Sequence, residues 1–68
     1  MSAVKVIEML AQSPKGWEDA TQIALKTAQK SLRNIQSIYV KEFQATVEGD
    51  HIAHYRVNVK ISFLVEDT

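Results

Sequence analysis

The chain contains no cysteine, only two glycines and one proline among its 68 residues. The absence of cysteine excludes disulfides and thiolate metal sites, and it is compatible with a reducing compartment. The scarcity of glycine leaves no glycine-rich loop for binding phosphates. We expect one domain, residues 1–68, because a chain of this length is too short for two. A core of this size rarely supplies more than about 3–5 kcal/mol of stability, so oligomerisation is the remaining source of buried surface.

An excess of charge of either sign is also missing. Eight acidic and eight basic residues give a formal net charge of zero, so no long-range field attracts nucleic acid or an anionic membrane. No apolar run approaches the ~20 residues that span a bilayer, and the first residues lack the pattern of a signal peptide. We therefore expect a cytoplasmic protein that binds neither nucleic acid nor membranes. The basic residues Lys26, Lys30 and Arg33 are interpreted as a solvated helix stripe.

The strongest pattern in the chain is the alternation in residues 51–67, "HIAHYRVNVKISFLVED". Apolar or aromatic residues occupy every second position from Ala53 to Val65, and mostly polar residues stand between them. Successive side chains of a strand point to opposite faces, so this stretch predicts one strand with a single apolar face. Its length of about 13 residues is more than twice the usual ~5–6.

Three further elements precede this strand. Residues 3–10 predict a first strand, and residues 14–32 predict a helix in which Ser13 is the cap and Pro14 the first residue. Residues 36–48 predict a second strand whose apolar positions change parity, which requires a bulge between Val40 and Phe43. Gly49 and Asp50 suit a tight hairpin turn.

The order strand, helix, strand, strand predicts an α+β fold of βαββ type. A right-handed crossover makes the first two strands parallel, and inserting the long last strand between them gives a three-stranded antiparallel sheet. One helix covers only part of such a sheet. The remaining surface and the sheet edges then need other subunits.

Catalytic patterns are lacking. No spacing sets a histidine beside a serine and a carboxylate, so we do not expect an enzyme. His51 and His54 are three residues apart on a strand and point to opposite faces, which prevents them from sharing one metal. Carboxylates gather as Glu48 and Asp50 near the turn, and as Glu66 and Asp67 near the end. In a symmetric assembly such groups would meet at an axis and bind Ca²⁺ or Mg²⁺, or else remain solvated charges.

Two long segments carry a family resemblance. "VKVIEMLAQSPKGWEDATQIALKTAQKSL" resembles the opening of the dodecins, and "AHYRVNVKISFLVED" resembles their last strand. The resemblance covers nearly the whole chain. It implies a βαββ subunit whose sheet partly wraps the helix, twelve of which form a hollow cage of cubic symmetry. It also implies a non-catalytic protein that stores flavin, as FMN or riboflavin, between stacked tryptophans of facing subunits.

The resemblance fails at the flavin clamp. Ser37 stands where flavin-binding dodecins begin the second strand with Trp, Arg56 stands in place of a Gln, and Gln44 in place of an Arg. The chain therefore resembles a branch without the stacking tryptophan, and we expect a homododecamer that binds or stores a small molecule other than through that clamp. One alternative is flavin binding through another aromatic, for which Tyr39 is the candidate. Another is a structural assembly that binds cations. Trp17 is expected to pack within the core or an interface.

Overall fold

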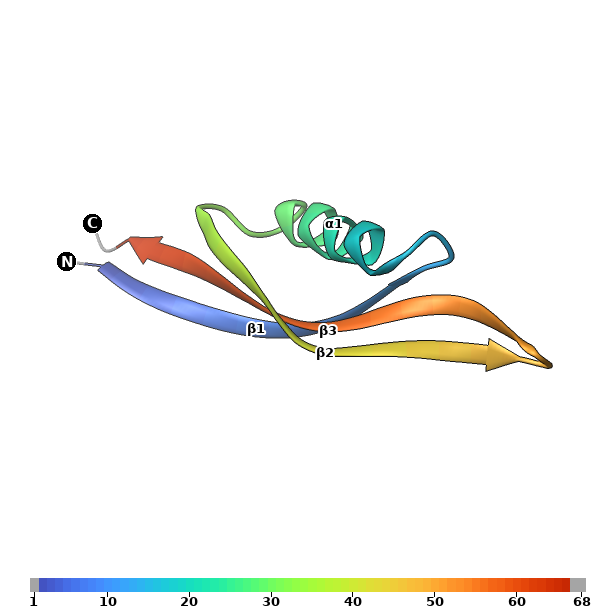
Figure 1. Ribbon diagram of the computed structural model, residues 1–68. Helices are drawn as coiled ribbons and strands as arrows, with labels where there is room; N and C mark the ends of the chain where they lie inside the picture. The colour runs from blue at the N-terminus through green and yellow to red at the C-terminus, as the bar shows by residue number, and fades with distance from the viewer. Residues whose placement is uncertain (1, 67–68) are drawn as a thin grey trace.

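A helix lies across one face of a long, twisted three-stranded sheet in the computed structural model, which describes residues 2–66 (Figure 1). The elements are β1 (Ser2–Ser13), α1 (Trp17–Gln29), β2 (Ile35–Glu48) and β3 (His51–Glu66). The sheet order is β1-β3-β2, and β3 is antiparallel to both neighbours. The predicted βαββ topology, with the longest strand in the centre, is confirmed.

The register of β2 against β3 confirms the predicted bulge. Val40 pairs with Val59 and Glu42 with Asn58, so the pairing skips a residue between them. After this shift Phe43 faces Val57, which lies on the same face of β3 as Val59. The bulge therefore keeps the apolar residues of both halves of β2 on the side of the helix. The turn that follows contains Gly49 with φ 61°, a left-handed conformation that glycine adopts without strain.

The helix is shorter than the 14–32 that the sequence predicted. It begins after Gly16, which is the N-cap and offers no side-chain oxygen, and it ends at Gln29. Ser13 is not the cap: its buried hydroxyl donates to Asp19 Oδ2 over 2.6 Å and accepts the Lys15 N–H over 3.0 Å, which holds the turn ahead of the helix. The apolar period misled the prediction because Leu32 still packs against the core from the loop that follows.

Small helix residues and branched strand residues make the core. Its fully or almost fully buried apolar members are Ala20, Ala24, Ala28, Val57, Val59 and Ile61. Alanine side chains let the helix approach the sheet closely, so the branched residues of β3 fill the space between them. A helix of 13 residues is about 20 Å long. The molecule extends 54 Å along its long axis, so the helix covers less than half of the sheet's length.

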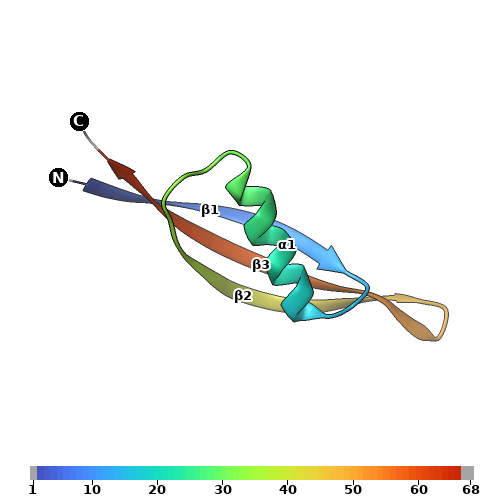
Figure 2. The ribbon, with the colours of Figure 1, turned by 90° about the horizontal axis from the view of Figure 1, so that it is seen from above.

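Figure 2 shows this arrangement from above: α1 lies over the middle of the sheet, and strands continue past both of its ends. In the described residues 2–66, no helix has the length and apolar character needed to cross a membrane.

Candidate functional site

The four residues predicted for a ligand site lie on the face of the sheet that is turned away from the helix. In the pairing of β2 with β3, Ser37 faces Ser62, Tyr39 faces Lys60 and Gln44 faces Arg56. These β3 residues alternate with the buried Val57, Val59 and Ile61, which face the helix. We call this side of the sheet, opposite α1, the outer face.

One half of the predicted set lies near the start of β2. The hydroxyls of Ser37 and Ser62 are hydrogen-bonded to each other across the two strands. Two residues along, Tyr39 exposes 62% of its surface. An open groove of about 280 Å³ lies on the other side of β2, between this strand and α1; it is lined by Leu25 of α1, by Ile35 and Ile38 of β2, and at its edge by Ser37. On the outer face, this end therefore offers hydroxyl groups and one exposed phenol ring.

The other half forms a polar row across all three strands. Arg56 of β3 lies between Gln12 of β1 and Gln44 of β2 in the register. Its Nε and Nη2 both donate to Gln12 Oε1, over 3.3 and 3.0 Å. This row presents one guanidinium and two amides, groups suited to anionic and carbonyl oxygens.

The two halves are too far apart for one chain to close all four residues around a small ligand. Ser37 pairs with Ser62 and Gln44 pairs with Arg56. Ser62 and Arg56 are six residues apart on β3, which is about 20 Å of extended strand. Tyr39 and Arg56 differ by four residues in the same register, or about 13 Å. A site that uses the whole set therefore requires residues from more than one copy of the chain.

The predicted cation ligands come from two separate segments of the chain. Glu48 and Asp50 lie at the β2–β3 turn, where Asp50 Oδ1 is 3.6 Å from His51 Nδ1. The side chain of Glu66, at the far end of β3, and all of Asp67 lie outside the described residues. Within the described part of the chain, no three His, Cys, Asp or Glu side chains gather closely enough to hold a metal ion.

Trp17 belongs to a separate aromatic cluster on the helix side of the sheet. Its ring meets Tyr55 and Phe43 edge-on, with centroid distances of 4.9 and 5.8 Å. Its indole N–H donates to the Gln44 carbonyl over 2.8 Å. These contacts fix Trp17 as a packing residue at the start of α1, on the opposite side of the sheet from Ser37.

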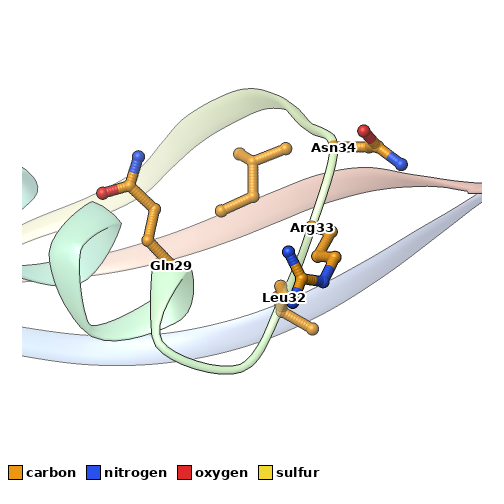
Figure 3. Close-up of a pocket in the computed structure, with 5 residues that line it drawn as sticks. Gln29, Leu32, Arg33 and Asn34 are labelled. Carbon is orange, nitrogen blue, oxygen red and sulfur yellow. The ribbon is translucent and has the colours of Figure 1, made fainter.

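The loop between α1 and β2 borders an open cavity of about 430 Å³ (Figure 3). It is lined by Gln29, Leu32, Arg33, Asn34 and Ile35, which include none of the predicted site residues. Arg33 and Lys30 follow the end of the helix, so the predicted basic stripe does not lie on a helix face. The stripe was predicted because the predicted helix ends at residue 32, three residues beyond the observed end at Gln29.

Comparisons with known proteins identify relatives of this chain by sequence and by fold. The Dodecin family model matches residues 3–66. Dodecin from Thermus thermophilus is 34% identical over 64 residues, covering 94% of this chain and 93% of the relative. Calcium dodecin from Mycobacterium tuberculosis is 33% identical over 63 residues, covering 93% and 89%.

Solved structures give the same result. A tryptophan-to-phenylalanine variant of the T. thermophilus dodecin superposes with a TM-score of 0.92 at 31% identity, covering 98% of this chain and 100% of the other. Dodecin from Streptomyces coelicolor gives 0.93 at 27% identity, covering 98% and 96%.

Proposed function

The chain belongs to the dodecin family, and on that premise we propose that it forms a homododecamer that binds or stores a small molecule and catalyses no reaction. The ligand is held without the tryptophan sandwich of the flavin-binding members. The residues proposed to meet it are Ser37, Tyr39, Gln44 and Arg56 of the outer face.

The elongated shape of the single chain is the observation that supports the proposed homo-oligomer. A compact monomer of 68 residues has a radius of gyration of about 11 Å. This chain has 14.1 Å and extends 54 Å in its longest dimension. A subunit so elongated leaves most of its sheet without a covering layer, which other copies of the chain would provide.

The chemistry at Ser37 argues against ordinary flavin binding. The resemblance places it at the stacking tryptophan, and its hydroxyl is bonded to Ser62. Base–aromatic stacking contributes about 1–3 kcal/mol per contact, so the loss of two facing rings weakens flavin affinity by about two to four decades. Tyr39 is the exposed ring nearest to Ser37 on the outer face, and flavin binding through it is the first alternative.

One experiment tests both parts of the proposal. Sedimentation equilibrium of the purified chain measures its mass, and riboflavin and FMN are then titrated while their fluorescence is followed. We expect the mass of twelve subunits and no quenching at micromolar flavin. A monomer would refute the assembly, whereas tight quenching would refute the loss of the clamp and favour Tyr39.

A second candidate function is cation binding. The name of the M. tuberculosis relative, a calcium dodecin, favours it. Glu48 and Asp50 from neighbouring subunits, or Glu66 and Asp67, would supply the oxygen ligands that Ca²⁺ and Mg²⁺ prefer. Calorimetric titration of each cation into chelator-treated protein tests this. The same titration of the Glu48→Ala variant tests whether the carboxylates at the turn are the ligands. Heat of binding that survives this substitution would exclude the turn as the site.

A further inference from the structure

The polar row of the outer face contains a positive charge without a counter-charge. Arg56 lies on β3, the central strand, so β1 and β2 flank it on both sides, and the residue is half-buried. The ion pairs formed within the described residues join Lys41 to Glu8 and His51 to Asp50, and neither includes Arg56. A partly buried charge is unfavourable while it is unpaired, so this guanidinium favours the binding of an anion.

The contact with Gln12 orients the guanidinium without neutralising it. Nε and Nη2 of Arg56 both donate to the neutral amide oxygen of Gln12, on β1. The carboxylate of the outer face that lies closest along the register is that of Glu42 on β2, which faces Asn58, one cross-strand pair away. The bond to Gln12 draws the guanidinium toward the opposite strand. Of its five N–H donors, these bonds use two, which leaves three for a ligand.

The position of the arginine within its cross-strand pair is what permits this contact. The family resemblance places an arginine at position 44 and a glutamine at position 56, and the register pairs these two positions directly. In this chain the two residue types are exchanged, so the guanidinium lies on the central strand, next to Gln12. An arginine at position 44 would be two strand spacings, about 10 Å, from β1. The pair thus keeps one positive charge, although Ser37 has no ring for stacking.

The row is also connected to the one tryptophan of the chain. The indole N–H of Trp17 donates to the backbone carbonyl of Gln44 over 2.8 Å, and the Gln44 side chain belongs to the row on the opposite side of the sheet. A ligand that binds the Gln44 amide therefore acts on a residue that is bonded to the indole. The fluorescence of Trp17 is thus a local reporter for binding at the row.

We propose that the small molecule of the outer face is an organic anion, whose carboxylate or phosphate oxygens bind the Arg56 guanidinium and the Gln44 amide. Gln12 is the positioning residue that holds the guanidinium. Hydrogen bonds from arginine to these anionic oxygens are charge-assisted and frequently bidentate, so they supply affinity that a stacked ring would otherwise supply. This inference rests on the proposed function and names the chemical class of its ligand.

Probes that differ in charge but little in shape test the inference. Benzoate and benzamide share a ring and a planar group, and only benzoate is an anion; phenyl phosphate provides the phosphate in place of the carboxylate. Equilibrium dialysis at low ionic strength measures the binding of each probe to the assembled chain, and Trp17 fluorescence reports whether it binds at the row. We expect the better of the two anions to bind about tenfold or more tighter than benzamide and to change the fluorescence. Equal binding of charged and neutral probes, or no binding of either anion, would overturn the inference.

Three variants that each lower the net charge by one locate the effect. Arg56→Gln removes the guanidinium, and Gln12→Glu keeps it but places a carboxylate against it, so both should abolish the preference for the anion. Lys26→Gln, at an exposed helix position, is the matched control and should retain it. An Arg56→Gln variant that retains the preference, or a control that loses it equally, would show that Arg56 is not the anion site. A monomeric wild-type chain, or tight flavin quenching, refutes the proposed function instead.

Discussion

Replacing Ile61 by alanine tests how little stability the single chain has of its own. Ile61 is fully buried on β3, where it lies between Ile7 of β1 and Ile38 of β2. Large-to-alanine substitutions in a core cost about 2–5 kcal/mol, and more where the site cannot collapse. Here the buried residues on the helix side of the core are already alanines, whose methyl side chains cannot rotate or extend into the void. We therefore expect a cost of about 4 kcal/mol.

That cost is nearly the whole stability of about 3–5 kcal/mol that a core of this size supplies. The Ile61→Ala chain should consequently fold only while it is assembled. Its urea midpoint, followed by far-UV circular dichroism, should then depend on protein concentration. In a large assembly each tenfold increase in concentration raises the free energy of unfolding by about 1.3 kcal/mol per subunit.

The matched control is Thr27→Ala, at an exposed helix position, which should change the free energy of unfolding by no more than about 0.5 kcal/mol. Two results would refute the reasoning. One is an Ile61→Ala variant that loses less than about 1.5 kcal/mol. The other is a midpoint that stays the same over a hundredfold range of concentration, because the chain would then be stable without neighbours.

Three further predictions concern single residues, and a fourth concerns cations. Ser37→Trp should restore a stacking surface and strengthen riboflavin binding by at least tenfold in a fluorescence titration, whereas Ser37→Ala should not. Gly49→Ala should lower stability by about 1–2 kcal/mol in thermal melts, because φ is 61° there and alanine is strained in this left-handed conformation. The new methyl group would meet no neighbouring atom, so no steric clash adds to this cost, and Gly49→Asn should cost less. Trp17→Phe keeps a ring but removes the indole N–H from the Gln44 carbonyl, so it should cost about 0.5–1.5 kcal/mol in urea, and Trp17→Ala more. If cations hold the assembly, chelator should lower its melting temperature and added Ca²⁺ should restore it; an unchanged melt would count against the cation function.

The sequence was sufficient for the topology because its patterns are local. Alternation from Ala53 to Val65 identified the central strand, and the parity change after Val40 located the bulge that the register contains. The helix ends were less visible. Leu32 continues the apolar period of the helix although the chain has already turned, and Ser13 satisfies the residue pattern of a cap while its hydroxyl binds Asp19.

For the candidate site, the sequence predicted separate residues but not their contacts. The bond from Arg56 to Gln12 joins positions 44 residues apart and depends on the register of β1 against β3, which no local pattern specifies. The bond from Trp17 to the Gln44 carbonyl is of the same kind. The distance of about 20 Å between the Ser37 and Arg56 ends of the outer face also emerged only from the pairing.

The alanines of the helix explain why the core of the single chain is small. Ala20, Ala24 and Ala28 bring α1 close to β3, but each contributes a single methyl group to the core. Most of the buried apolar volume must then come from the sheet, and the sheet can bury only the part of its length that lies under a helix about 20 Å long. Larger residues on the helix would thicken this core without covering the ends of the strands. The uncovered strand ends are a consequence of the long β3, and in the proposed homo-oligomer other copies of the chain would cover them.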